Sequence, residues 1–237
     1  MTAKPIELIL FDIDGTLVLT GGAGARAMTR AFADVFDLRQ GLAGVSMAGR
    51  TDTWILTEMA RQHGLEYDEP MLQRFHTTYL DYLSFEIQQP GTSRKAILPG
   101  VRELLDALVT RDDVYLALLT GNFSGGARLK LEHFDLWRYF PCGAFAEDAP
   151  ERNALLAKAL ARVAASGGPT LAAADAIVVG DTPHDVNVAL AGGAKSLAVA
   201  TGSFDVQALR ETGADVVLED LSDLPSVLSV LKRNPNP

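Results

Sequence analysis

Three groups of oxygen-bearing residues follow apolar runs of this sequence, and their types suggest one kind of chemistry. The groups are Asp12 and Asp14 after 6–11, Thr120, Gly121 and Asn122 at the end of 114–120, and Asp181 and Asp185 after 176–180. Carboxylate and carbonyl oxygens are the ligands of hard cations, of which Mg²⁺ is the usual one. Two unit charges about 4 Å apart repel by about 4 kcal/mol at an effective dielectric of 20. Four converging carboxylates would therefore require either protonation or a bound cation, and we expect Mg²⁺.

The spacing within the first pair also has a structural meaning. Residues two apart on an extended strand point the same way, so Asp12 and Asp14 can face one reaction centre while Ile13 turns into the core. Gly15 permits the chain to leave the strand sharply. The same Asp-Gly sequence also favours a β-hairpin in which residues 16–20 form the returning strand, so a simple turn remains an alternative for this segment.

The elements that would position these groups alternate between strand and helix. Further strands are predicted at 142–146, 196–201 and 214–219. Most runs are continuously apolar, which is typical of strands buried on both faces of a parallel sheet. Amphipathic helical patterns lie between them, for example at 99–113 and 152–163. This alternation predicts an α/β fold with a doubly wound, Rossmann-like parallel sheet, in which ligands bind beyond the carboxyl ends of the strands.

One interval interrupts the alternation with helical patterns alone. Between Thr16 and about Pro99 the segments 25–36, 52–64 and 68–87 have helical periodicity, and Asp52 is a plausible N-cap of the second. Gly, Pro and Ser are frequent at both flanks, as expected for the attachment of a mobile inserted domain. We therefore predict a core of residues 1–19 and 95–237 and an inserted helical cap with its linkers at 20–94, with the aromatic residues Trp54, Phe75, Tyr79 and Tyr82 in the cap core.

Composition and charge restrict the partners. The 237 residues are 48% hydrophobic and carry a formal net charge of -9, which disfavours nucleic acid and anionic membranes because both require basic patches. The single cysteine, Cys142, excludes an intrachain disulfide. The N-terminus lacks the features of a signal peptide and no apolar run reaches about 18 residues. We expect a cytoplasmic protein that binds neither nucleic acid nor membrane, and the sequence leaves the oligomeric state open.

The motifs "DIDGT", "LLTGN" and "VVGDTPHD", in this order and with a helical insert after the first, resemble the haloacid dehalogenase superfamily. More narrowly, the chain resembles its phosphatases with a small helical cap, of the phosphoglycolate phosphatase type, over essentially its whole length. The resemblance implies Mg²⁺-dependent hydrolysis of a small phosphorylated metabolite through an aspartyl-phosphate, with 2-phosphoglycolate as the leading candidate. It also implies a short β-flap just after the first motif. This flap agrees in part with the alternative that the first motif is a β-hairpin turn.

The resemblance implies a role for each matching residue. Asp12 would be the nucleophile, and Asp14 would be the general acid that protonates the leaving alkoxide and then the base that activates water. Thr120 would hydrogen-bond the phosphoryl group, and Gly121 and Asn122 would contact the substrate. The metal ligands would be the Asp12 carboxylate, the Asp14 carbonyl oxygen and Asp181, with Asp185 supporting them directly or through water.

The sequence departs from the family at the third motif, where a lysine is usual. Arg152 lies at the expected loop-to-helix junction, and Lys158 lies six residues further, about 240° around a helix. We favour Arg152 because a guanidinium stays charged and can grip phosphate in a bidentate manner. Both could instead be solvated surface charges. Arg50, in the turn 48–52 between cap helices, is a candidate for contact with a substrate carboxylate, or else an ordinary solvated loop residue.

Other functions fit parts of the same pattern. A sugar phosphomutase would use the same machinery, whereas a phosphonate hydrolase would need a cap lysine, and the insert carries only Lys95, in its second linker. A phosphoacceptor signalling domain also uses an aspartate at a sheet edge, but it is shorter and lacks a long helical insert. A catalytically inactive relative is disfavoured because every catalytic position is filled except for the lysine-to-arginine change.

Overall fold

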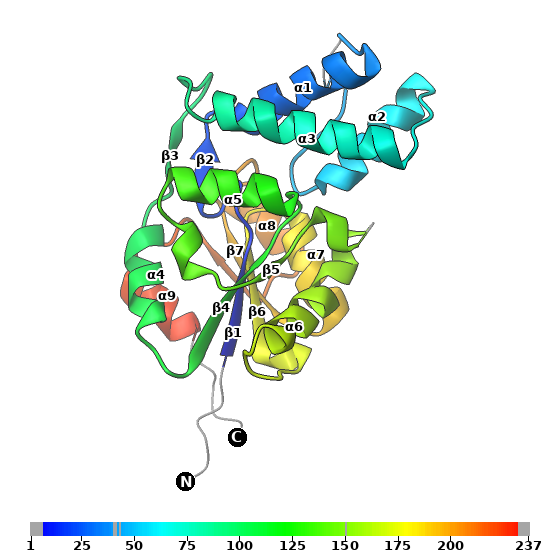
Figure 1. Ribbon diagram of the computed structural model, residues 1–237. Coiled ribbons are helices and arrows are strands. Elements are labelled where there is room, and N and C mark those ends of the chain that lie inside the picture. Colours follow the sequence, from blue (N-terminus) through cyan, green and yellow to red (C-terminus); the bar gives the residue numbers. More distant parts are fainter. Residues whose placement is uncertain (1–6, 40–41, 43, 150, 232–237) are drawn as a thin grey trace.

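A six-stranded parallel sheet forms the centre of the molecule (Figure 1). The computed structural model describes residues 7–39, 42, 44–149 and 151–231. The strand order is β5-β4-β1-β6-β7-β8, and every neighbouring pair is parallel. The strands are β1 (Glu7–Phe11), β4 (Val114–Leu119), β5 (Gly143–Ala144), β6 (Ala176–Gly180), β7 (Lys195–Val199) and β8 (Val216–Leu218). This arrangement confirms the predicted doubly wound α/β core, and β1 lies in the middle of it.

Helices cover both faces of the sheet because the strands alternate between two apolar cores. Ile9 and Phe11 of β1 pack into the core on one face, whereas Leu8 and Leu10 pack into the core on the other. The first face is covered by α4 (Val101–Val109), α5 (Ser124–His133) and α9 (Leu224–Val230). The second is covered by α6 (Leu155–Ala165) and α7 (Pro183–Gly192), and α8 (Val206–Glu211) packs beside β7. The resulting three layers hold the carboxyl ends of β1, β4 and β6 together at one edge.

The inserted segment forms three helices above that edge (Figure 1). They are α1 (Ala23–Phe36), α2 (Asp52–His63) and α3 (Glu69–Glu86). The aromatic side chains of Phe32, Phe75 and Tyr79 are fully buried in a separate apolar cluster between them. A helical cap on an α/β core is therefore confirmed. Of the four aromatic residues predicted for the cap core, Phe75 and Tyr79 are buried in it, whereas Trp54 and Tyr82 are only partly buried at its edge.

The N-cap prediction for α2 was wrong by one residue. Thr51 is the cap, and its hydroxyl oxygen accepts a hydrogen bond from the backbone nitrogen of Trp54 at 3.0 Å. Asp52 is the first helical residue, and its carboxylate accepts instead from the backbone nitrogen of Phe123 in the core at 2.8 Å. Thr and Asp are both good caps, so local sequence could not decide between them. The distant Phe123 N–H decided it.

A short antiparallel pair of strands joins the cap to the core. β2 (Val18–Thr20) pairs with β3 (Lys95–Ile97), with Val18 opposite Ile97. The alternative hairpin between the first strand and residues 16–20 is thus not formed, because β2 pairs with β3, a strand that the sequence did not indicate. Three-residue strands carry too little periodicity to be recognised. The division into core and cap at these points stays a prediction.

The described residues include no helix that is both long enough and apolar enough to cross a bilayer. Residues 1–6, on which the expectation about a signal peptide depends, lie outside the described part of the chain.

Candidate active site

The three predicted groups of residues meet around one cavity of about 440 Å³ between the sheet edge and the cap. Seven of the nine predicted site residues line it. Six of them come from the core, namely Asp12, Asp14, Gly121, Asn122, Arg152 and Asp181, and Arg50 lines it from the cap. Thr120 and Asp185 are buried next to these residues but do not line the cavity. The chain therefore brings side chains from three separate strand ends to a common point, as a parallel sheet requires.

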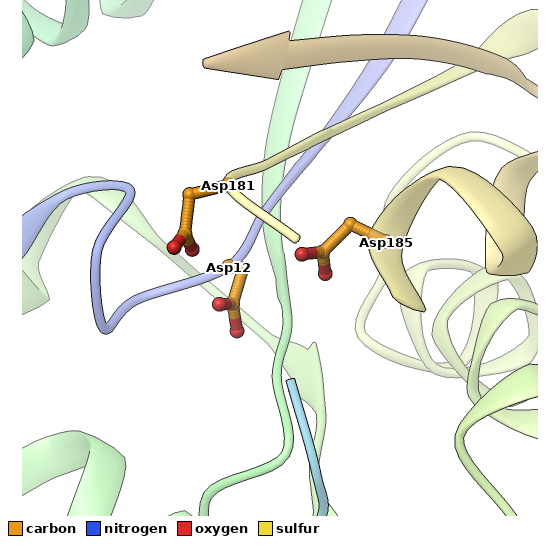
Figure 2. Close-up of side chains that lie close together, drawn as sticks. All are labelled: Asp12, Asp181 and Asp185. Atoms are coloured by element: carbon orange, nitrogen blue, oxygen red, sulfur yellow. The ribbon is translucent and has the colours of Figure 1, made fainter. Parts of the chain in front are cut away.

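Three buried carboxylates lie close together beside this cavity (Figure 2). Asp12 follows β1, Asp181 follows β6, and Asp185 lies in the first turn of α7. One oxygen from each lies within 4.8 Å of the others. Asp185 is held by Thr182, whose hydroxyl donates to its Oδ2 at 2.7 Å. The position of Asp181 requires a glycine nearby: Gly15 has φ 85°, and a Cβ there would overlap the Asp181 carboxylate.

The electrostatics of this carboxylate triad (Asp12, Asp181 and Asp185) show that negative charge exceeds positive charge. Burial raises the pKa of Asp12 to about 7, and Asp185 and Asp14 add to the rise while Arg152 and Thr120 oppose it. Burial, together with Asp185 and Asp12, likewise raises the pKa of Asp181 to about 8. Oxygen donors that are held together and incompletely neutralised are suited to a divalent cation. The triad therefore fits a metal site formed by carboxylates.

Arg152 provides the positive charge at the triad. It begins the 3-10 turn η3 (Arg152–Ala154) and its side chain is 8% exposed. Its Nη2 lies 3.2 Å from Asp12 Oδ1 and also forms an ion pair with Asp185, and these two carboxylates raise the pKa of Arg152 against the opposing effect of burial. Lys158 is exposed on α6. Of the two predicted cations, the structure places Arg152 at the site.

Asp14 faces the cavity but is turned away from the triad. Its Oδ2 accepts hydrogen bonds from Asn122 Nδ2 at 2.9 Å and from Lys130 Nζ at 2.5 Å. Asn122 Nδ2 also donates to Thr120 Oγ1 at 2.8 Å. Asp12 and Asp14 therefore open onto one cavity, as the spacing predicted, with different neighbours. The metal-binding role predicted for the Asp14 carbonyl oxygen stays a prediction.

Lys130 was not predicted from the sequence. It is 4% exposed on α5, and its Nζ donates to both Asp14 Oδ2 and Asn122 Oδ1 at 2.5 Å. A signal was present, because Lys130 shares the buried face of α5 with Ala127 and Leu131. A lysine on the apolar face of a helix needs a partner, and Asp14 is that partner.

The cap loop 47–52 packs closely against the core. The backbone nitrogen of Asp52 donates to the Gly121 carbonyl at 2.7 Å, and Arg152 Nη1 donates to the Gly49 carbonyl at 3.0 Å. A Cβ on Gly121 would overlap the Arg50 carbonyl. Arg50 is exposed, and its guanidinium carbon lies 4.3 Å from the centroid of the Trp54 ring. The structure thus places the backbone of Arg50 at the core, while its role toward a substrate carboxylate stays a prediction.

Comparison with known proteins agrees with this geometry. The chain is 26% identical over 246 residues to the probable phosphatase IndB of Dickeya dadantii, covering 95% of each protein. It is 26% identical over 225 residues to a phosphoglycolate phosphatase of Pseudomonas syringae pv. tomato, covering 92% of this chain and 78% of the relative.

Solved structures share the fold. A hydrolase from Pseudomonas syringae superposes with a TM-score of 0.67 at 21% identity, covering 94% of this chain and 98% of that one. CbbY from Rhodobacter sphaeroides in complex with phosphate superposes with a TM-score of 0.68 at 19% identity, covering 92% and 96%. The family model for haloacid dehalogenase-like hydrolases matches residues 9–199. These residues include all three motifs and the whole inserted cap, so the chain belongs to the haloacid dehalogenase-like hydrolases.

Proposed function

We propose that this protein is a Mg²⁺-dependent phosphatase that hydrolyses a small phosphorylated metabolite through an aspartyl-phosphate. The observation that carries the proposal is the arrangement around the cavity: a nucleophilic carboxylate, Asp12, lies in a buried carboxylate triad, and a second carboxylate, Asp14, lies beside it with separate partners. Such a pair can divide nucleophilic attack and proton transfer between two groups. Several relatives are named phosphatases, which supports the same reaction class.

The first half of the proposed reaction transfers the phosphoryl group to the protein. An oxygen of Asp12 attacks phosphorus, the new P–O bond forms as the ester P–O bond breaks, and Asp14 gives its proton to the departing alkoxide. Thr120, which is close enough to Asp12 to lower its pKa, would hydrogen-bond the phosphoryl oxygens. Arg152 orients the nucleophile through its contact with Asp12 Oδ1.

The second half restores the protein. Asp14, now a carboxylate, takes a proton from water, which attacks phosphorus and releases inorganic phosphate and the Asp12 carboxylate. Asp12, Asp181 and Asp185 would hold the cation, as their mutual distances and incomplete neutralisation indicate. Bound Mg²⁺ would supply charge neutralisation for the phosphoryl oxygens. Unassisted hydrolysis of phosphate monoesters is among the slowest reactions known, so covalent capture by Asp12 combined with charge neutralisation by a cation suits this reaction.

Similarity makes 2-phosphoglycolate the first metabolite to test, because relatives from several bacteria are named phosphoglycolate phosphatases. A sugar phosphomutase is the principal alternative within the family. It would transfer the phosphoryl group to a second hydroxyl of a sugar phosphate without net release of phosphate. A phosphonate hydrolase is disfavoured because α1, α2 and α3 contain no lysine.

The test measures phosphate release from p-nitrophenyl phosphate. We expect activity with Mg²⁺, loss of activity with EDTA, and loss of activity in Asp12→Asn, which keeps the shape of the side chain without the nucleophile. Asp81→Asn, at an exposed position of α3, is the matched control and should retain activity. Persistent turnover by Asp12→Asn would show that Asp12 is not the nucleophile.

A further inference from the structure

One part of the cavity wall carries buried polar groups to which the proposed chemistry gives no direct role. Asp52 and Tyr79 belong to the cap and Lys130 to the core, and all three line the cavity together with the small residues Gly24 and Ala25 of α1. Asp52 is 6% exposed, Tyr79 1% and Lys130 4%. Polar groups so deeply buried normally have hydrogen-bond partners. The donors and acceptors that have no partner within the described part of the protein therefore indicate what this wall can bind.

Asp52 has one carboxylate oxygen without a partner. Its Oδ2 accepts from the backbone nitrogen of Phe123 at 2.8 Å. No hydrogen bond between described residues uses Oδ1, and this atom is not among the fully enclosed polar atoms of the described chain. Burial raises the pKa of Asp52 to about 6, and Lys130 opposes that rise. At neutral pH the cavity therefore contains an anionic acceptor that needs a donor.

Tyr79 and Lys130 also have hydrogen-bonding groups without a partner among the described residues. Tyr79 lines the cavity, no hydrogen bond between described residues uses its hydroxyl, and this oxygen is not among the enclosed polar atoms that lack a partner. Lys130 Nζ has three N–H donors, of which Asp14 and Asn122 accept two. The wall thus offers a pure acceptor at Asp52, a pure donor at Lys130, and a hydroxyl at Tyr79 that can act as either.

We propose that Asp52, Tyr79 and Lys130 form the leaving-group subsite, and that it selects phosphate esters of hydroxyl-bearing alcohols, such as polyols and sugars, over esters that carry a carboxylate. This inference rests on the proposed phosphatase function. Hydroxyl groups both donate and accept, so neighbouring hydroxyls satisfy Asp52 and Lys130 together. A carboxylate is an acceptor only. It could pair with Lys130, but Asp52 Oδ1 would then remain unpaired beside a second negative charge.

Small side chains support the assignment by leaving room beside Lys130. A Cβ on Gly24 would lie 3.4 Å from Lys130 Nζ, so a larger residue in this turn of α1 would fill the space in front of the ammonium group. The subsite consequently ranks 2-phosphoglycolate, the candidate suggested by the relatives' names, below hydroxyl-bearing esters of similar size.

The test uses two pairs of phosphate esters. The members of each pair differ only in carrying a hydroxymethyl group or a carboxylate. 2-Hydroxyethyl phosphate is compared with 2-phosphoglycolate, and glycerol 3-phosphate with 3-phosphoglycerate, by measuring kcat and KM with Mg²⁺. A site that hydrogen-bonds a substrate hydroxyl discriminates strongly, and one hydrogen bond to a charged group corresponds to about tenfold or more. We expect the wild-type protein to prefer the hydroxyl member of each pair by at least that factor.

Variants separate the subsite from general effects. Asp52→Asn keeps an oxygen for Phe123 but removes the charge, and it should lower the hydroxyl-to-carboxylate ratio of kcat/KM by about tenfold or more. Tyr79→Phe should lower kcat/KM for the hydroxyl esters mainly through KM. Asp81→Asn, on the exposed face of α3, should leave the ratio unchanged.

The outcomes of the two proposals are distinguishable. If p-nitrophenyl phosphate is not hydrolysed with Mg²⁺, the phosphatase function is wrong and the subsite assignment falls with it. Three results would overturn the subsite assignment alone, provided that p-nitrophenyl phosphate is hydrolysed. They are a preference for the carboxylate members, no reaction with any of the four esters, and an unchanged hydroxyl-to-carboxylate ratio in Asp52→Asn.

Discussion

Replacing Asp12 by Asn should stabilise the metal-free protein at pH 8 while abolishing its activity. Burial raises the pKa of Asp12 from 3.8 to about 7. A carboxyl group whose pKa is higher in the folded chain than in the unfolded chain makes folding less favourable as the pH rises between the two values. The difference is about three pKa units, at about 1.4 kcal/mol each, so the charge on Asp12 destabilises the folded protein by up to about 4 kcal/mol above pH 7.

The assay is urea unfolding in EDTA, followed by circular dichroism at pH 8 and pH 4.5. Asp12→Asn should have the larger free energy of unfolding at pH 8, by about 2 to 4 kcal/mol. The difference should shrink toward zero at pH 4.5, where the folded wild-type protein holds the proton. Asp81→Asn serves as the control for the loss of one negative charge at an exposed site.

Addition of Mg²⁺ should narrow or reverse the order at pH 8, because a ligand that binds only the folded state stabilises it and the wild-type site has the additional carboxylate. The reasoning is refuted if Asp12→Asn is less stable than the wild-type protein in EDTA at pH 8, or if the gap between them is independent of pH. Either result would mean that the charge of Asp12 is already neutralised within the protein.

Two further substitutions test the cationic side chains beside Asp12 and Asp14. Lys130→Met removes the donor that Asp14 and Asn122 share. The kcat with p-nitrophenyl phosphate should therefore fall about tenfold or more, which is the equivalent of one charge-assisted hydrogen bond. An unchanged kcat would show that Asp14 does not need the hydrogen bond from Lys130. Arg152→Met leaves the triad without its arginine and should destabilise the metal-free protein by about 3 kcal/mol or more in urea unfolding. Lys158→Met, at an exposed position, should change the free energy of unfolding little. Equal effects of the two substitutions would contradict the placement of Arg152 at the triad.

Much of the fold could be predicted because it depends on local patterns. Continuous apolar runs identified the six core strands, since a strand buried on both faces cannot alternate. Helical periodicity between residues 20 and 94 identified the cap. β3 could not be identified, because its three residues form a strand only through pairing with β2, far away in the sequence. The cap of α2 was misplaced for the same reason: the N–H that binds Asp52 belongs to Phe123.

The candidate site was predicted where residues follow strands or begin a helix, and it was missed where a residue lies in the middle of a helix. Asp12, Asp14 and Asp181 come directly after buried strands, so the topology of a parallel sheet alone brings them together. Lys130 lies in the middle of α5, where its charge could be assigned to solvent or to a partner. Only the packing of α5 against the first motif shows that the partner is Asp14.

The sequence by itself determined that carboxylates gather at one edge of a parallel sheet, because the carboxylates, their order and their places after apolar strands are all local features. The tertiary structure decided which cation serves the triad, since two candidates six residues apart differ only in whether the chain buries them, and it buries Arg152. It also decided which side chains meet in the proposed leaving-group subsite. Asp52, Tyr79 and Lys130 come from three helices, and no local pattern relates them until the cap packs on the core.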